Sequence, residues 1–299
     1  MSTMVRAVLA TVVVVALLVA GRSLLVDDPE PAAPDAAAVQ RQCVAALPAD
    51  VKLAQKIMLA GFTGTLDTQA DAFARYDVGG VILMDAAPAD VVSSFVAAQR
   101  VPPFVATDQE GGTVQRYPSD PALPSAVAMA RLGADEAYRL YAEDARRLHE
   151  TGITTNFAPV AGVRGDADPL PGRMYSGSPD VVVALAGQAV RASRDNGVTA
   201  VVKHFPGLGT TVVNTDLRPV RTAPFAQLQR RDLRAFDRLA ALGSDLMMSN
   251  ARVPGLTGDE PAGLSAAAVD AARSQYGFAD AVIYTDSLTA GAVDRPVPK

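Results

Sequence analysis

The chain has 299 residues, of which 49% are apolar and 20% are charged, and its formal net charge is −5. This composition is ordinary for a globular protein with a substantial core. The charges are spread along the chain without runs, so nothing indicates a nucleic-acid-binding surface. Cys43 is the only cysteine in the sequence, which excludes a disulfide within one chain.

The N-terminal residues have the pattern of an export signal. Arg6 precedes the apolar run Ala7–Ala20, and a basic flank before such a run is typical of a secretory signal peptide. If the apolar character continues beyond this run, residues 1–26 could instead remain as an uncleaved membrane anchor, with membrane contact through residues 7–26. A buried core helix is less favoured, because a Pro-, Ala- and Asp-rich linker follows over residues 27–45. We therefore expect an extracytoplasmic protein, secreted or anchored to the outer face of the cytoplasmic membrane.

Residues 46–299 are predicted to form the folded domain, in which apolar runs alternate with amphipathic stretches. The apolar residues come in continuous blocks, as expected for strands buried on both faces of a parallel sheet. The predicted strands are Lys56–Phe62, Gly79–Asp85, Pro103–Asp108, Ile153–Val160, Val198–Phe205, Ser244–Asn250 and Ala281–Asp286.

Helix-like stretches separate these strands. Asp135–Gly152 opens with acidic residues and ends at a glycine, and Ser178–Gly197 has Ser178 as its predicted N-cap and Pro179 at its first helical position. Leu264–Gly277 repeats the pattern. The alternation predicts an α/β fold, and the number of strands favours a (β/α)8 TIM-type barrel over a doubly wound sheet. No strand is followed by a glycine-rich phosphate-binding motif, so a nucleotide site is not expected.

Polar side chains stand at the C-terminal ends of three predicted strands. One strand ends in Asp108, another in Lys203 and His204, and the last in Asp286. Each of these residues could simply cap the helix that follows. Barrel enzymes, however, build their active sites at this edge from the ends of several strands. A carboxylate, a cation and an imidazole at three strand ends therefore favour a common site.

The same motifs resemble those of a known family. The segments "DQEGG-VQR", "KHFPG-G" and "VI-TD-L", in this order and near these separations, resemble glycoside hydrolase family 3, above all its single-domain β-N-acetylglucosaminidase branch. The resemblance runs from about Leu53 to the end of the chain and includes "VGGVIL" and "NFAPV". It implies a (β/α)8 barrel that hydrolyses terminal β-linked sugars with retention of configuration, without a metal or an organic cofactor.

The resemblance also implies roles for individual residues. Asp286 stands where the family has its nucleophile, which attacks the anomeric carbon and forms a glycosyl-enzyme. An ionised carboxylate is needed there. Charged side chains suit a pyranose because its hydroxyls need oriented hydrogen bonds. The residues that would bind the sugar hydroxyls are Asp108, Arg116, Arg173, Lys203 and His204.

The family's acid/base position departs from the usual pattern. A retaining glycosidase needs an acid to protonate the leaving oxygen, and the better-known glucosaminidases supply a histidine from an Asp-Ser-His triplet. In this chain the triplet falls on Asn214, Thr215 and Asp216, so Asp216 occupies the histidine position. Asp216 could serve as the acid if a closed loop buries it and raises its pKa. The alternative is that Asp216 is a solvated loop residue and that the site binds sugar without turnover.

The sequence after Asp286 is short for a complete barrel. Only 13 residues follow it, whereas a closed barrel needs one more strand and two more helices. We therefore expect an incomplete barrel of about seven βα units. Either the chain is truncated relative to its relatives or something else fills the gap, and an open barrel would expose two parallel sheet edges.

Three functional hypotheses remain open from the sequence. The first is an exported, monomeric β-N-acetylglucosaminidase that acts on cell-wall fragments or other β-glucosaminides. The second is a catalytically silent sugar-binding or wall-associated protein on the same scaffold, which the missing acid/base histidine favours. The third is a β-glucosidase or β-xylosidase of the same family, whose two-domain members take their acid from a second domain.

Overall fold

The computed structural model describes residues 42, 43 and 45–293. The signal peptide or anchor expected over residues 1–26 lies outside the described residues, as does most of the linker expected over 27–45. The chain divides into two compact units, Met1–Lys52 and Leu53–Lys299. In the part of the chain that the structure describes, no helix is long and apolar enough to cross a membrane.

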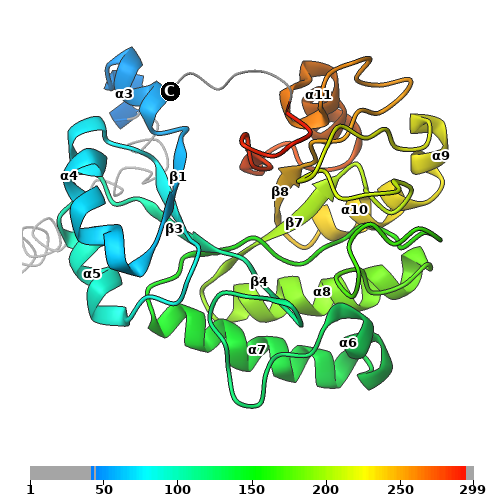
Figure 1. The fold of residues 1–299 in the computed structure, drawn as a ribbon, viewed down its shortest axis with the longest axis horizontal. Helices are drawn as coiled ribbons and strands as arrows, with labels where there is room; N and C mark the ends of the chain where they lie inside the picture. The colour runs from blue at the N-terminus through cyan, green and yellow to red at the C-terminus, as the bar shows by residue number, and fades with distance from the viewer. Residues whose placement is uncertain (1–41, 44, 294–299) are drawn as a thin grey trace, which may run out of the picture. The chain divides into compact units, whose positions relative to one another are not determined.

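A seven-stranded parallel sheet forms the centre of the second unit, and its strands follow one another in chain order (Figure 1). All seven predicted strands are therefore confirmed, although each is shorter than its apolar run. Within the described residues β1 and β9 are the edges of this sheet. The strands are β1 (Met58–Gly61), β2 (Gly80–Leu83), β3 (Phe104–Thr107), β6 (Thr155–Asn156), β7 (Thr199–Phe205), β8 (Asp245–Met248) and β9 (Ile283–Thr285).

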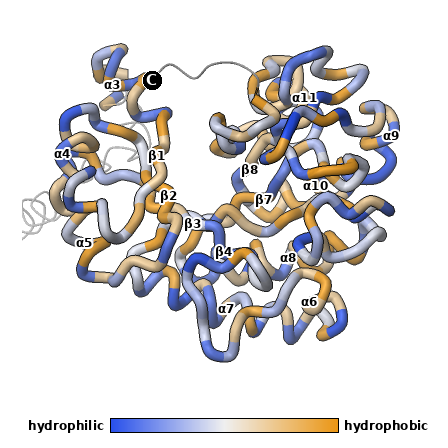
Figure 2. The backbone as a smooth tube through the Cα atoms, in the orientation of Figure 1, coloured by the Kyte–Doolittle hydropathy of each residue, from blue (hydrophilic) through white to orange (hydrophobic). Residues whose placement is uncertain are grey.

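Helices lie between successive strands, and the sheet curls inside them (Figure 1), which confirms the predicted barrel-type α/β fold with seven strand units. The hydropathy of the chain follows this arrangement, since the central strands are among its most apolar segments (Figure 2). The helices are α3 (Ala49–Ala54), α4 (Leu66–Tyr76), α5 (Ala89–Ala97), α6 (Ala126–Leu132), α7 (Ala134–Glu150), α8 (Pro179–Asp195), α9 (Phe225–Gln229), α10 (Asp232–Ala240) and α11 (Ala266–Gln275), with 3₁₀ turns η1 (Thr63–Thr65) and η2 (Ala262–Leu264).

Helix α8 begins where its sequence predicts. Pro179 occupies the first turn, where its missing N–H costs nothing, and Ser178 is the N-cap residue. The Ser178 side chain makes no capping hydrogen bond, so only the position of this cap is as predicted.

The C-terminal half of β7 is fixed by packing on both sides. Val202 and Phe205 belong to the main hydrophobic core beneath the helices, where the Phe205 ring meets Phe236 edge-on at 5.4 Å between centroids. Val201 packs in a separate cluster with Phe157. The register between β7 and β8 shifts between Val202 and Phe205, so the pairing is irregular at Lys203 and His204. These two polar residues therefore stand on a rigid strand whose regular alternation is interrupted.

A short hairpin follows β3 and was not predicted. It consists of β4 (Gln109–Gly111) and β5 (Val114–Gln115), which pair antiparallel. Gly111 has φ +95° and its missing side chain leaves room for the carbonyl of Pro124, which a Cβ would approach to 2.3 Å. Only glycine fits this tight turn.

Candidate active site

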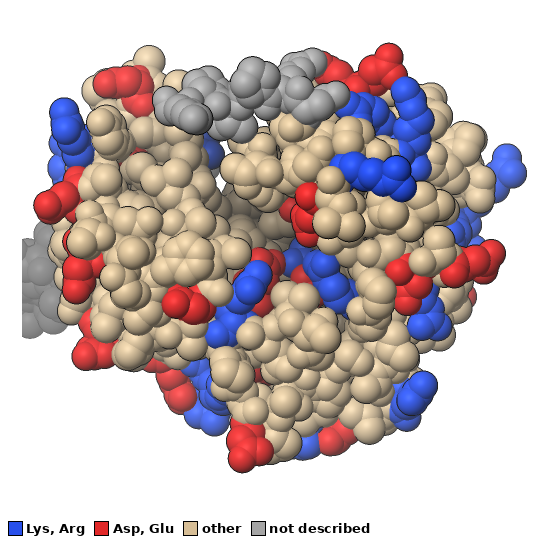
Figure 3. All heavy atoms as spheres, viewed as in Figure 1, with Lys and Arg blue, Asp and Glu red and all other residues tan. Residues whose placement is uncertain are grey.

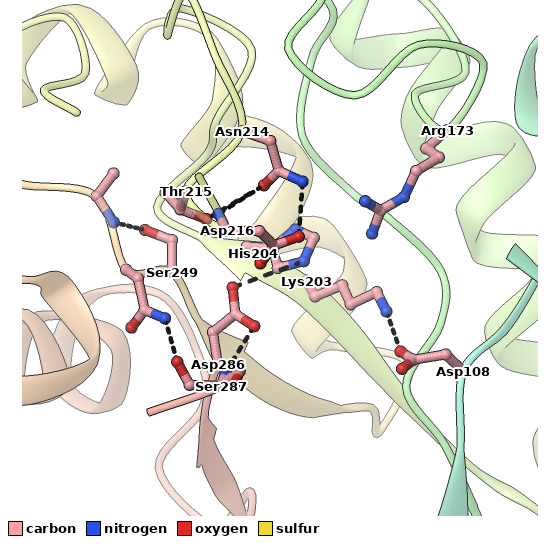
Figure 4. Close-up of polar contacts among 12 residues, drawn as sticks. Asp108, Arg173, Lys203, His204, Asn214, Thr215, Asp216, Ser249, Asp286 and Ser287 are labelled. Carbon is pink, nitrogen blue, oxygen red and sulfur yellow. Dashed lines mark hydrogen bonds and ion pairs between the residues drawn. The ribbon is translucent and has the colours of Figure 1, made fainter. Parts of the chain in front are cut away.

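The structure brings the polar strand ends together at one edge of the sheet. Lys203 Nζ, from β7, donates a hydrogen bond of 2.6 Å to Oδ1 of Asp108, which follows β3 (Figure 4). Asp286, which follows β9, lies on the other side of His204 (Figure 4). In the space-filling view, acidic and basic side chains gather beside a hollow at the centre of this face (Figure 3).

The Glu110 carboxylate pairs with two cationic side chains of this site. Lys203 Nζ lies 2.6 Å from Glu110 Oε1. Arg173, from the loop between β6 and α8, donates two hydrogen bonds to the same carboxylate, at 2.7 and 2.8 Å. The side chains of Glu110 and Lys203 are only 4% and 2% exposed, so this is a buried ion cluster. Sequence reasoning missed Glu110, although it lies two residues after Asp108 in the "DQEGG" motif.

The protonation states of Glu110 and Lys203 are set by the charged side chains around them rather than by solvent. Burial alone would raise the pKa of Glu110, but Lys203 and Arg173 outweigh it and lower that pKa to about 2. Burial would lower the pKa of Lys203, yet the Asp108 and Glu110 carboxylates raise it above its usual value. Glu110 and Lys203 are therefore both ionised at neutral pH and can make charge-assisted hydrogen bonds.

Hydrogen bonds between the "NFAPV" and "DQEGG" motifs hold the β4–β5 hairpin in place. The Asn156 side chain, in "NFAPV", accepts a hydrogen bond from Gln109 N and donates one to Gln109 O, both of 3.0 Å. Gln109 Nε2 donates in turn to Asp144 Oδ1 and to the Tyr117 carbonyl. Because both neighbours of Gln109 in the chain carry site carboxylates, these bonds fix Asp108 and Glu110 at once.

Arg116 ends the same motif and differs from Arg173 in its contacts. Its Nε atom is buried and has no hydrogen-bond partner within residues 42–43 and 45–293, and the same holds for His204 Nδ1. A buried polar atom without a partner is costly. Each of these two atoms would therefore gain from a hydrogen bond to a ligand that reaches it.

Asp286 is a mostly buried carboxylate beside a neutral imidazole. Its side chain is 16% exposed, its Oδ1 accepts a hydrogen bond of 2.8 Å from Ser287 N, and its Oδ2 lies 4.0 Å from His204 Nε2. Burial raises the pKa of Asp286 to about 6, against the opposing effect of Lys203. Burial and the nearby charge of Lys203 hold the pKa of His204 well below its usual range. At neutral pH Asp286 is thus ionised and His204 is not.

Asp216 lies on the loop after β7 and is exposed. The structure therefore does not show the burial that the sequence interpretation required of an acid at this position. Asn214 Nδ2 donates to Asp216 Oδ2 at 2.7 Å, and Asn214 Oδ1 accepts from Asp216 N at 3.2 Å (Figure 4). The Asp216 charge still contributes to raising the pKa values of both Asp286 and Arg173. Asp216 is therefore electrostatically part of the site.

Two further residues lie outside the site contacts. His149 is exposed on α7, and Leu208, within the "KHFPG-G" motif, is buried. Among the residues that the structure describes, no group of three or more His, Cys, Asp or Glu side chains could hold a metal ion.

Comparison with known proteins gives a consistent assignment. The profile of the glycosyl hydrolase family 3 N-terminal domain matches residues 49–297. The beta-hexosaminidase LpqI of Mycobacterium tuberculosis is 34% identical over 283 residues, covering 87% of this chain and 72% of that protein. A family 3 glycosyl hydrolase from Mycobacterium smegmatis has a solved structure with a TM-score of 0.75 at 34% identity, covering 84% of this chain and 80% of that one. The beta-N-acetylhexosaminidase of Beutenbergia cavernae gives 0.74 at 30% identity, covering 83% and 81%.

The profile match, the sequence identities and the superposed folds all extend over most of the chain, and they agree with the motifs that lie at the edge of the sheet. This chain belongs to glycosyl hydrolase family 3.

Proposed function

We propose that the protein is a retaining glycosidase that hydrolyses terminal β-N-acetylglucosaminides through a glycosyl-enzyme on Asp286. The observation that carries the proposal is the position of Asp286, a mostly buried carboxylate at the strand ends, next to the ion cluster around Lys203. The preference for an N-acetylated sugar rests on relatives named beta-hexosaminidase and beta-N-acetylhexosaminidase.

The sugar would bind between Asp286 and the ion cluster around Lys203. Asp108 and Lys203, together with Arg116, Arg173 and His204, offer oriented donors and acceptors to its hydroxyls. Because Glu110 already neutralises part of the positive charge, Lys203 and Arg173 can bind neutral hydroxyls without being left as uncompensated buried cations.

In the first chemical step a carboxylate oxygen of Asp286 bonds to the anomeric carbon as the glycosidic C–O bond breaks. Asp216 gives its proton to the leaving oxygen. In the second step Asp216 takes a proton from water, whose oxygen bonds to the anomeric carbon while the ester bond to Asp286 breaks. The sugar keeps its β configuration after two inversions. Because Asp216 is exposed here, the proposal requires that its loop close over the bound sugar.

A second candidate is a sugar-binding protein without turnover. The exposure of Asp216 favours it, since an acid in contact with solvent is not held for proton transfer.

Export is also proposed, on the sequence of residues 1–26 alone, and cell-wall fragments are the proposed source of the glucosaminide.

The test is the release of nitrophenol from an aryl β-N-acetylglucosaminide by the full chain. Turnover that Asp286→Asn abolishes, with sugar binding retained, would support the enzyme. A folded parent protein that binds N-acetylglucosamine and releases no nitrophenol would identify the binding protein. Turnover that is faster on the aryl glucoside or xyloside would instead reject the N-acetyl preference.

A further inference from the structure

The residues directly after Asp286 are bonded to the loop that carries Asp216. Gly291 N donates a hydrogen bond of 2.9 Å to the Asp216 carbonyl, and Ala292 N donates one of 2.9 Å to the Thr215 carbonyl. These two contacts join residues that are more than 70 positions apart in the chain. They connect the backbone that follows Asp286, the proposed nucleophile, to the loop of Asp216, the proposed acid/base.

The segment 287–293 is fixed at its start. Asp286 N donates to the Met248 carbonyl at the end of β8, at 3.1 Å. The Asn250 side chain donates to the Ser287 carbonyl at 2.7 Å. The nucleophile and the first residue of the segment are therefore held on the sheet.

The segment is also compact between its ends. Ala290 N donates to the Ser287 carbonyl and Val293 N to the Ala290 carbonyl, so two turns follow one another. Ala290 and Ala292 are 7% and 0% exposed. Two buried alanines and two turns make the segment a short spacer rather than a free tail.

The contact at Gly291 leaves no room for a side chain. A Cβ on this residue would lie 2.5 Å from the Leu217 carbonyl oxygen and 2.9 Å from the Asp216 carbonyl oxygen. Both are backbone atoms, which cannot rotate away as a flexible side chain does. Any residue other than glycine must therefore move the Asp216 loop or the segment.

We propose that Gly291 is a positioning residue, through which segment 287–293 sets the place of the Asp216 carboxylate relative to Asp286. The inference rests on the proposed function, in which Asp216 is the acid/base. In this arrangement Asn214 orients the carboxylate within its own loop, while Gly291 and Ala292 orient the loop against the nucleophile.

The test is Gly291→Ala, assayed with aryl β-N-acetylglucosaminides whose leaving groups span a range of pKa values. Activated leaving groups need little acid help, whereas poor ones need the general acid. We expect kcat/KM to fall by roughly 100-fold for the poorest leaving group and by less than about 3-fold for the best, in parallel with Asp216→Ala. Gly64→Ala is the matched control, because a Cβ there meets nothing within 4 Å.

The outcomes separate the inference from the proposed function. If Asp216→Ala depends on the leaving group and Gly291→Ala behaves as the parent, the inference is wrong and the function stands. An equal loss on every substrate by Gly291→Ala would mean general structural damage and would also reject it. If Asp216→Ala shows no leaving-group dependence, the acid/base assignment itself fails, and the inference fails with it.

Hydrogen exchange on the parent protein gives a second measurement that does not depend on a folded variant. The Gly291 and Ala292 amides are expected to exchange slowly, because both are donors in backbone hydrogen bonds. Exchange as fast as that of an unstructured peptide would show that the connection does not persist in solution and would overturn the inference.

Discussion

Arg173 and Glu110 form a two-bond pair at the edge of the sheet where the polar strand ends meet, with N–O distances of 2.7 and 2.8 Å. Such a parallel pair fixes the plane of the guanidinium as well as its position. Lys203 shares the same carboxylate and also binds Asp108. The Glu110 carboxylate therefore orients two of the three cationic side chains that were expected from the sequence to bind sugar.

Replacement of the Glu110 carboxylate should lower the free energy of unfolding. Glu110→Gln leaves Lys203 and Arg173 buried with one fewer negative charge, and breaking a buried ion pair typically costs about 3–5 kcal/mol. We expect a loss of unfolding free energy of this order in urea denaturation, together with a raised KM. Glu136→Gln, which removes the exposed partner of Arg139 on α7, is the control and should leave the urea midpoint unchanged. Similar midpoints for the two variants would contradict the central place of Glu110.

Arg116 should show the opposite pattern to Glu110. Its buried Nε has no hydrogen-bond partner among residues 42–43 and 45–293, so we expect Arg116→Met, which keeps an aliphatic stem, to change the stability little. If the guanidinium binds a sugar hydroxyl, the loss of a charge-assisted bond of about 1.5–3 kcal/mol raises KM by roughly 10- to 100-fold. Steady-state kinetics and a melting curve check this. An unchanged KM with a lowered melting temperature would assign Arg116 to the fold and not to the sugar.

The pH dependence of catalysis should follow Asp286. Burial raises the pKa of this carboxyl to about 6, and only its ionised form can attack the anomeric carbon. The value of kcat/KM, which reports the free enzyme, should therefore fall as the pH drops through about 6. Samples stopped in alkali allow nitrophenol to be read at every pH. An acidic limb centred near pH 4 would mean that Asp286 titrates as an ordinary solvent-exposed carboxyl.

Asp232 offers a test of the fold that is separate from catalysis. It is 0% exposed, accepts a hydrogen bond from Val163 N, and has its pKa raised by burial to about 6. Because the folded pKa lies above the unfolded value of about 4, this group favours the folded state at low pH, and that contribution is lost as the pH rises from about 4 to 6.

The variant Asp232→Asn keeps an oxygen acceptor and cannot titrate. Its unfolding free energy relative to the parent should therefore increase by up to about 3 kcal/mol between pH 4 and pH 6, and stay constant above pH 6. Urea denaturation at several pH values measures the difference. A difference that does not vary with pH would show that Asp232 ionises equally easily in both states.

Much of the fold could be predicted from the sequence, because its strands are continuous apolar blocks bounded by turn residues. The edge of the sheet that holds the site also followed from the sequence, since parallel strands place all their C-terminal ends together. Asp108, Lys203 and Asp286 were found in this way. Asp108 and Asp286 are the first charged residues after β3 and β9, and Lys203 lies in the C-terminal half of β7, so the signal is local.

The contacts that organise the site could not be predicted in the same way. Arg173 and Glu110 are 63 positions apart, and no periodicity relates them. The β4–β5 hairpin is too short to give an alternating pattern, so Glu110 was not recognised as a buried acid. The exposure of Asp216 and its bond to Gly291 depend on how two loops meet, which is a property of the assembled sheet.

The ion cluster also determines how the site looks to an approaching molecule. The formal charges of the site residues nearly cancel, since Lys203, Arg173 and Arg116 are cationic, Asp108, Glu110, Asp216 and Asp286 are acidic, and His204 is neutral. The site is thus close to electrical balance and exerts little long-range attraction on charged solutes. An uncharged glycoside would meet it by ordinary diffusion, and its rate of encounter would change little between low and high ionic strength.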